Sequence, residues 1–197
     1  MNQNDAHNIL HFLQESERLK NVYRTSWTSD GRQESTASHT WRLCLMALIV
    51  ERYLPEIDIA KLLKLCVIHD LGEAIHGDIP AIYQSEESQK SITERADLLQ
   101  LTQSLPPEIR QEIIDLWDEY EHATSPEAKV AKALDKLETL LQHNQGANPP
   151  DFDYVFNINY GRQFTDDIPL TATLRAIIDD ETKRNASEVN GYDLSDE

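Results

Sequence analysis

The fold is decided by residues 66–80, which read Cys66-Val67-Ile68-His69-Asp70-Leu71-Gly72-Glu73-Ala74-Ile75-His76-Gly77-Asp78-Ile79-Pro80. An apolar helical run over residues 59–68 ends here in an adjacent histidine and aspartate, and such a pair can bind a divalent cation. Glu73 follows Asp70 by three residues, so both carboxylates lie on one face if the helix continues. Glycine and proline near the end of the stretch stop the element, which places Asp78 at its rim. Such a pair arises easily by chance in an acidic chain, so a metal site requires further ligands from elsewhere.

The composition is that of one globular domain with a strongly negative surface. The chain of 197 residues can bury a substantial core, and 40% of the residues are hydrophobic. The formal net charge of −17 repels nucleic-acid backbones and anionic membranes, so we expect no DNA or RNA polymer and no membrane among the partners. An anionic substrate would need local cations or a metal ion to bind such a protein.

Neither a targeting signal nor a disulfide framework is apparent in the sequence. Residues 1–5 lack the basic and apolar pattern of a signal peptide, and the apolar run 43–50 is too short to cross a bilayer. Cys44 and Cys66 lie on apolar helical stretches without the spacing of a zinc site. We interpret both as buried free thiols and expect a cytoplasmic protein.

Apolar residues recur at helical intervals along most of the chain, and no repeat or strand pair with a hairpin turn stands out. We predict an all-α fold with one domain, residues 1–184, and a metal site between its central helices. The predicted helices, with Asp58 and Ser125 as caps, cover residues 5–22, 35–53, 59–68, 91–104, 108–121, 125–145 and 168–182. Residues 22–34 and 82–90 are predicted to be polar connections, and the acidic tail 185–197 is predicted to be disordered.

The connection before the second helix concentrates two arginines and a tryptophan in an otherwise acidic chain: Arg24, Trp27 and Arg32. One interpretation is a surface loop with an anchoring aromatic side chain. The other is a contact with a phosphate and a ring, since guanidinium groups bind phosphate oxygens and aromatic rings stack. The residues alone leave both interpretations open, with the surface loop favoured.

The further ligands that the histidine–aspartate pair requires are present on two other predicted helices. The candidate ligand set is His39, His69, Asp70 and Asp135. Two imidazoles and two carboxylates suit one divalent ion such as manganese, cobalt, iron, nickel or zinc better than calcium, and magnesium stays open as well. Such an ion keeps positions for water and a substrate oxygen, which is the arrangement for metal-activated water attacking phosphorus.

Each ligand also has an ordinary structural interpretation. His39 lies in the first turns of a helix, and His69 lies at a helix end where a cation is favoured by the helix dipole. Asp135 could pair at the surface with Lys132 or Lys136. Each of these interpretations is reasonable alone. If all of them hold, the order of the four candidate ligands along the chain is a coincidence.

That order on helices resembles the HD superfamily of metal-dependent phosphohydrolases, and within it the branch of the 5′-deoxynucleotidases and their HD-domain-containing relatives. The similarity covers roughly residues 8–184, nearly the whole chain. The motifs that carry it are Glu34-Ser35, Ser38-His39-Thr40-Trp41-Arg42, His69-Asp70-Leu71-Gly72-Glu73-Ala74, Gly77-Asp78-Ile79-Pro80, Trp117, Glu119-Tyr120-Glu121, Ala133-Leu134-Asp135-Lys136-Leu137-Glu138 and Asn159-Tyr160-Gly161.

The resemblance implies a role for each candidate residue. The metal ligands would be His39, His69, Asp70 and Asp135. Glu73 would be the catalytic carboxylate that orients or deprotonates the attacking water, and Asp78 a second carboxylate that contacts the sugar or its water network. Arg24 would contact the phosphate, with Trp27 as the aromatic residue close to it.

Two residues depart from the pattern of the family. Relatives usually carry an acidic residue before the first histidine, where this chain has Ser38, and a hydrogen bond that tunes the ligand could differ. His76 is an additional histidine near the site, and the sequence leaves open whether it touches substrate or metal.

The resemblance implies hydrolysis of nucleoside 5′-monophosphates, with deoxyribonucleotides preferred. Another phosphoester is an alternative substrate: a cyclic nucleotide, a guanosine polyphosphate or a non-nucleotide ester. A metal- or nucleotide-binding module without turnover, and a purely structural helical protein, are the non-enzymatic alternatives. Relatives are commonly dimers, so a homodimer is a further expectation.

Overall fold

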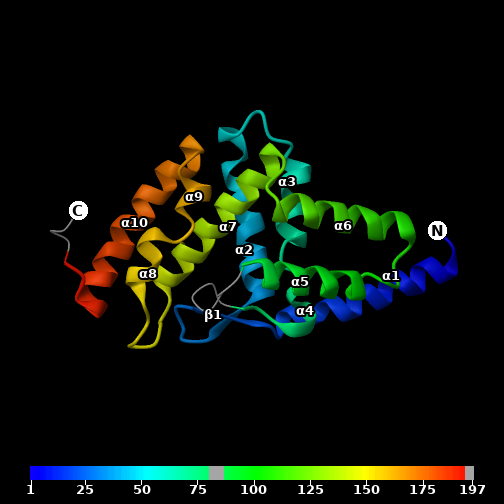
Figure 1. The fold of residues 1–197 in the computed structure, drawn as a ribbon, viewed down its shortest axis with the longest axis horizontal. Coiled ribbons are helices and arrows are strands. Elements are labelled where there is room, and N and C mark those ends of the chain that lie inside the picture. Colours follow the sequence, from blue (N-terminus) through cyan, green and yellow to red (C-terminus); the bar gives the residue numbers. More distant parts are fainter. Residues whose placement is uncertain (80–86, 194–197) are drawn as a thin grey trace.

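A computed structural model of the chain describes residues 1–79 and 87–193. Helices dominate the described residues, which confirms the all-α prediction (Figure 1). The helices are α1 (Gln3–Ser16), α2 (Thr36–Val50), α3 (Ile59–Ile68), α4 (Glu73–His76), α5 (Glu87–Leu101), α6 (Pro107–Glu121), α7 (Pro126–Gln145), α8 (Tyr154–Asn159), α9 (Arg162–Thr165) and α10 (Pro169–Asn190). Two 3₁₀ turns, Glu17–Lys20 and Glu51–Tyr53, follow α1 and α2.

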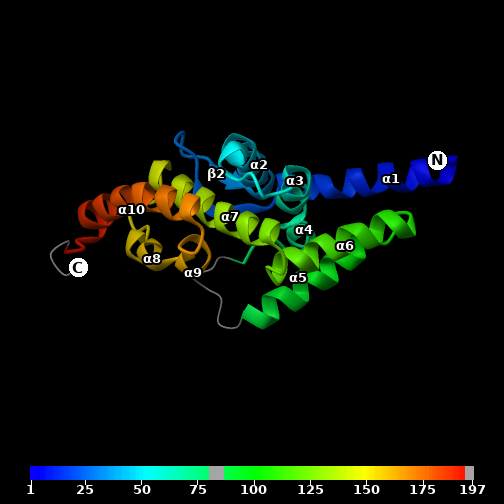
Figure 2. The ribbon, with the colours of Figure 1, turned by 90° about the horizontal axis from the view of Figure 1, so that it is seen from above.

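Helix α7 is the centre of the molecule. It packs against α2 and α3 on one side and against α9 and α10 on the other (Figures 1 and 2). Ser125 caps its start by accepting a hydrogen bond from the backbone N–H of Ala128, and Pro126 occupies the first turn, where no N–H is required. Leu134 and Leu137 are completely buried. Helix α7 therefore holds polar residues in fixed places between two groups of helices.

Helix α3 has the predicted bounds, and its start is specified locally. The Asp58 carboxylate accepts hydrogen bonds from the backbone N–H groups of Ala60 and Lys61 at its start. Leu62 and Leu65 are completely buried, as expected for a central helix. Asp70 and Glu73 were expected to share one helical face if the helix continued past Ile68. Instead, α3 ends at Ile68 and the chain turns before the short α4 begins.

The connection predicted at residues 22–34 is a short antiparallel hairpin, so its prediction as irregular chain was wrong. Strands β1 (Tyr23–Trp27) and β2 (Gln33–Ser35) pair with an irregular register, and Gly31 adopts a positive φ of 77° in the turn. The Gln142 side chain of α7 donates a hydrogen bond of 2.5 Å to the Trp27 carbonyl oxygen. The hairpin is thus held by a helix more than a hundred residues away, which no local pattern reveals.

The last helix extends beyond its predicted end, and this corrects the tail predicted from residue 185. Helix α10 continues to Asn190, since Ala186 is buried and Gly191 caps the helix with φ 68°. The Asn190 side chain accepts a hydrogen bond of 2.9 Å from the Tyr154 backbone N–H. The prediction of a disordered tail therefore remains only for residues 191–197. Of these, residues 194–197 lie outside the described part of the chain.

Other boundaries changed by smaller amounts. Helix α5 begins at Glu87, inside the polar connection predicted for residues 82–90, and residues 80–86, with Pro80, lie outside the described part of the chain. Cys66 is buried and Cys44 only partly so, and both thiols are free. Among the described residues, no helix combines the length and apolar character needed to span a membrane.

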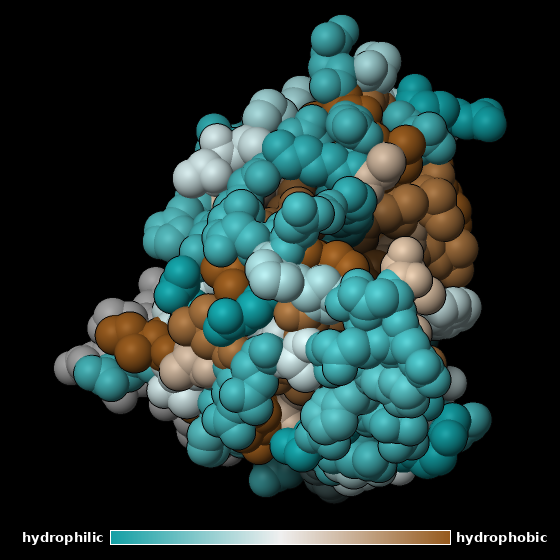
Figure 3. All heavy atoms as spheres, turned by 90° about the vertical axis from the view of Figure 1, so that its right-hand side faces the viewer, coloured by the Kyte–Doolittle hydropathy of each residue, from teal (hydrophilic) through white to brown (hydrophobic). Residues whose placement is uncertain are grey.

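Helix α1 projects from the body at one end (Figures 1 and 2). None of its residues is buried, and Leu10 and Leu13 are more than half exposed. The space-filling view of this end is mostly hydrophilic with separate apolar areas (Figure 3). Helix α1 therefore contributes little to the core that positions the site.

Candidate metal centre

Two imidazoles face one another where α2 and the end of α3 meet. The rings of His39 and His69 have centroids 5.4 Å apart, and both side chains are buried. The Nδ1 atom of His39 hydrogen bonds to the Glu138 carboxylate, and the Nδ1 of His69 lies 2.8 Å from the Cys66 carbonyl oxygen. When each Nδ1 carries the proton, each Nε2 presents a lone pair.

Two carboxylates complete the group. The Asp70 Oδ2 lies 3.0 Å from the Nε2 of His69 and 3.8 Å from that of His39. The Asp135 Oδ1, from α7, lies 3.1 Å from the Nε2 of His39 and 3.9 Å from that of His69. The fold thus brings together all four ligands proposed from the sequence.

The donor atoms fit a divalent cation. The Nε2 atoms of His39 and His69 and the Oδ2 of Asp70 are buried and have no hydrogen-bond partner within the described chain. Ligand atoms from these three residues lie within 4.8 Å of one another. Buried polar atoms are costly without a partner, and a metal ion would supply one to all three.

The charges of the site favour ionised carboxylates. Burial raises the pKa of Asp70, but the two imidazoles and Arg24 outweigh it and hold that pKa below its usual range. Burial likewise opposes ionisation of Asp135, and Lys136 and the imidazoles lower its pKa well below normal. Both groups are therefore in the form that binds metal.

Glu73 and Asp78 lie beside this centre on α4 and just beyond it. Glu73 is only 2% exposed, and its Oε2 accepts a hydrogen bond of 3.2 Å from the Thr36 hydroxyl. Burial, together with the charges of Asp70 and Asp78, raises the pKa of Glu73 well above its usual value. Asp78 follows Gly77, which ends α4 with φ 87°, and is partly buried.

The hairpin brings Arg24 to the same centre. One guanidinium nitrogen lies 3.5 Å from the Asp70 Oδ2, and another donates a hydrogen bond of 3.0 Å to the Thr139 hydroxyl. Burial lowers the pKa of Arg24, but Asp70 and the neighbouring carboxylates raise it above its usual range. Arg24 is therefore not the surface residue that the favoured interpretation of its loop assumed.

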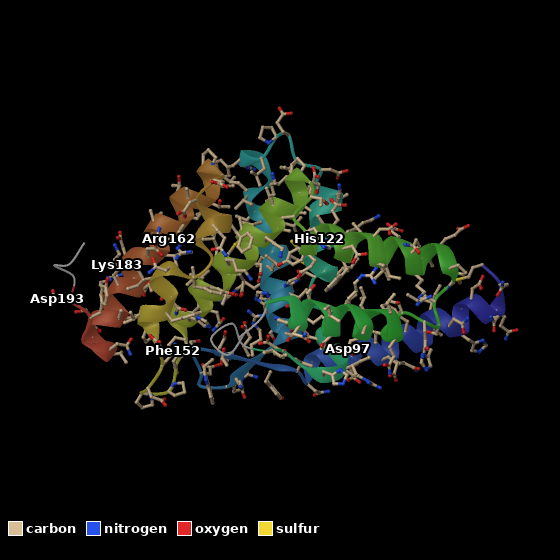
Figure 4. The ribbon with its side chains drawn as sticks, viewed as in Figure 1. Asp97, His122, Phe152, Arg162, Lys183 and Asp193 are labelled. Atoms are coloured by element: carbon tan, nitrogen blue, oxygen red, sulfur yellow. The ribbon has the colours of Figure 1, made fainter. Side chains whose placement is uncertain are left out.

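One cavity of about 660 Å³, a volume typical of a small-molecule site, is lined by most of the proposed site residues but not by His39. The site residues that line it are Arg24, His69, Asp70, Glu73, Asp78 and Asp135. Trp27 lines it as well, on the hairpin side. Aromatic side chains also line the cavity, among them Phe152, Phe156 and Phe164. Tyr120 and Tyr160 line it nearer the charged residues, where Tyr120 contacts Asp135 and the Tyr160 ring lies beside Lys136. Phe152, labelled in Figure 4, lies beside α8. The cavity thus joins a charged end, where a phosphate would fit, to an aromatic end, where a planar ring would fit.

The tertiary structure gives contacts to two polar residues that the sequence motifs contained without a role. Glu138 binds the Nδ1 of His39 and also accepts a hydrogen bond of 2.6 Å from the Arg42 Nε. Its spacing of three residues from Asp135 was the available signal. Tyr120 donates a hydrogen bond of 2.9 Å to the Asp135 Oδ2. These groups orient the proposed ligands.

The two departures from the family pattern have local explanations. The Ser38 hydroxyl lies 2.9 Å from that of Ser35 at the start of α2, so it belongs to the helix cap. The side chain of His76 is 67% exposed and its Nδ1 lies 2.7 Å from the Oδ2 of Asp97, a residue of α5 labelled in Figure 4. His76 is not among the residues that line the cavity.

Comparisons with known proteins place the chain among similar sequences. The model of the HD domain family matches residues 16–172. The human 5′-deoxynucleotidase HDDC2 is 34% identical over 142 residues, which cover 71% of this chain and 69% of the human protein. The 5′-deoxynucleotidase hdd1 of Schizosaccharomyces pombe is 34% identical over 148 residues, 72% of this chain and 74% of that protein.

A solved structure extends the similarity to the fold. The crystal structure of a predicted metal-dependent phosphohydrolase from Magnetospirillum magnetotacticum MS-1 superposes with a TM-score of 0.80 at 27% identity. The match covers 93% of this chain and 95% of that one.

Proposed function

The chain belongs to the HD domain family, and from this premise we propose that it removes the 5′-phosphate of nucleoside monophosphates, preferentially deoxyribonucleotides, with one bound divalent metal ion. One observation carries the proposal: three buried donor atoms without hydrogen-bond partners in the described chain lie within 4.8 Å of one another, and two of their residues, His69 and Asp70, line the charged end of a cavity. The names of the relatives support the choice of substrate.

The proposed ligands of the ion are His39, His69, Asp70 and Asp135. A divalent ion, when bound, lowers the pKa of water and polarises a phosphoryl oxygen. The ligand set admits manganese, cobalt, iron, nickel, zinc or magnesium, and which of them is bound depends on availability.

The surrounding residues would perform the hydrolysis. Glu73 takes a proton from the attacking water, and its raised pKa makes it a stronger base than an ordinary carboxylate. The water oxygen forms a bond to phosphorus while the bond to the 5′-oxygen breaks, and the 5′-oxygen leaves with a proton from solvent. Arg24 offsets the charge of the phosphate, which an otherwise acidic protein would repel. Asp78 contacts the sugar or its water network, and Trp27 lies against the nucleotide.

The test is phosphate release from a panel of deoxyribonucleoside and ribonucleoside monophosphates with Mn²⁺ or Co²⁺. We expect release from the deoxyribonucleotides, and Glu73→Gln should lower kcat by about 100-fold or more while the metal stays bound, since it removes a general base. No release from any nucleotide by metal-loaded wild-type protein would refute the proposal. Cyclic nucleotides, guanosine polyphosphates and simple phosphomonoesters in the same panel test the alternative substrates, and stabilisation by a nucleotide without turnover would indicate a binding module.

We also retain the homodimer and the cytoplasmic location as proposals. Large apolar side chains on one face of α2 are exposed, among them Trp41 and Ile49, at 67% and 65%. Exposed apolar surface of this kind often binds another protein. Light scattering of the purified protein measures the dimer directly, and a single monomeric mass would exclude it.

A further inference from the structure

One lysine lines the part of the cavity wall that α4 and α5 form. Lys90, near the start of α5, lines the cavity and is 23% exposed. Its Nζ lies 3.2 Å from the Glu94 Oε1, 3.6 Å from the Glu73 Oε1 and 3.8 Å from the Asp78 Oδ1. None of these distances is as short as a direct charge-assisted hydrogen bond, which is about 2.8 Å. The ammonium group therefore pairs most closely with Glu94 and also lies beside Glu73 and Asp78.

The backbone holds Lys90 in this position. A Cβ atom on Gly72 would lie 2.5 Å from the Glu94 carbonyl oxygen, so the turn before α4 and the helix α5 are in close backbone contact. Glu94 is one helical turn beyond Lys90 and pairs with it. This contact ties the lysine to the segment that carries Glu73.

Lys90 and Arg24 interact electrostatically with the same three carboxylates from different elements. Asp70, Glu73 and Asp78 each raise the pKa of both cations, although burial lowers it in each case. Arg24 reaches these carboxylates from β1 and Lys90 reaches them from α5. The two cations thus flank the carboxylates beside the proposed metal site.

The other lysines of the cavity are differently placed. The Lys136 Nζ lies 2.8 Å from the Asp135 Oδ2, a direct ion pair with a proposed metal ligand. The Lys132 Nζ lies 5.1 Å from the centre of the Tyr120 ring and 5.4 Å from that of the Phe164 ring. Of the three, Lys90 is the one beside the proposed catalytic carboxylate.

We propose that Lys90 contacts the phosphoryl group of the substrate, opposite Arg24, and so completes a pair of cations around it. The inference rests on the proposed phosphomonoesterase function. A phosphate dianion here is attracted by the proposed metal ion and by Arg24 but repelled by Glu73 and Asp78, and a cation between those two carboxylates lowers the repulsion. Lysine suits this place because its three donors can contact the Glu73 carboxylate and a phosphoryl oxygen at the same time.

The experiment measures the binding of inorganic phosphate to the Mn²⁺-loaded protein by calorimetry, together with kcat and KM. We expect Lys90→Met and Lys90→Gln to weaken phosphate binding by at least about 10-fold and to raise KM, since a charge-assisted contact is lost. Lys90→Arg should stay within about 3-fold of wild type because it keeps the charge. Lys64→Met is the matched control, since Lys64 is an exposed lysine of α3 that pairs with Glu112.

The affinity for Mn²⁺ shows whether a Lys90 variant has lost only a contact with phosphate or whether the metal site itself has changed. Removal of a cation near the proposed ligands does not weaken binding of another cation, so Lys90→Met should keep its affinity for Mn²⁺. Folded, metal-loaded Lys90 variants that bind phosphate as wild type does would overturn the inference. If wild type binds phosphate but hydrolyses no nucleotide, the proposed function fails while the loss of phosphate binding in Lys90→Met still supports the contact.

Discussion

At the scale of single residues, the orientation of His39 depends on a carboxylate from another helix. Glu138 is completely buried and contacts both the His39 Nδ1 and the Arg42 guanidinium group. The carboxylate holds the ring with its Nε2 toward Asp70 and Asp135, so it acts as a positioning residue.

We predict that Glu138→Gln weakens Mn²⁺ binding by roughly 10-fold or more, because the amide holds the imidazole less firmly than the carboxylate does. Titration of the metal-free protein with Mn²⁺ measures the affinity. Glu112→Gln, at an exposed ion pair with Lys64, is the control. Equal affinities of Glu138→Gln and wild type, with both folded, would contradict the prediction.

At the scale of elements, the start of α3 contributes to stability through one cap. Asp58 satisfies two backbone N–H groups of a helix whose inner face is completely buried. The opposite end of α3, after Ile68, delivers His69 and Asp70 to the site. A loss at this cap is therefore transmitted to the whole core.

We predict that Asp58→Ala lowers the free energy of unfolding by about 1 kcal/mol, the usual contribution of an N-cap. Urea denaturation followed by circular dichroism measures the change. Asn2→Ala is a matched control, since Asn2 caps α1 by accepting a hydrogen bond of 2.8 Å from the Asp5 backbone N–H. Helix α1 has no buried residue, so its cap should have a smaller effect on global unfolding. Equal losses in the two variants would show that α1 belongs to the cooperative core.

At the scale of the whole molecule, a buried imidazole couples stability to pH. His143 lies on α7 with its Nδ1 3.2 Å from the Asn157 Oδ1, and its ring packs edge-on against Phe152. Burial lowers the pKa of His143 to about 4, with Arg24 adding to the effect and Glu138 opposing it. The unfolded chain, with a pKa near 6.5, binds more protons between these values. The contribution to stability is therefore complete above pH 6.5 and is lost as pH falls toward 4.

We predict that wild-type protein loses about 2 kcal/mol more of its unfolding free energy between pH 7 and pH 5 than His143→Gln does. Glutamine does not titrate in this range, so the difference between the two slopes reports His143 alone. Urea denaturation at both pH values gives the comparison. Parallel pH dependence in the two proteins would show that His143 keeps a normal pKa in the folded state.

The sequence predictions succeeded where neighbouring residues decide the structure and failed where packing of the whole molecule decides it. The bounds of α3 and the start of α7 followed from Asp58, Ser125 and Pro126, because caps and the first helical turn depend on neighbours in the chain. The hairpin and the last turns of α10 depend on contacts with α7 and with Tyr154, and no short window of sequence contains those partners.

The candidate site divides in the same way. The residue types and order of His39, His69-Asp70 and Asp135 were sufficient to predict that these side chains lie together, while their binding of a metal ion stays a prediction. Their distances came only from the crossing of α2, α3 and α7. Lys90 and Glu138 could not be assigned from sequence because a side-chain contact between helices is set by packing geometry, which depends on the whole core at once.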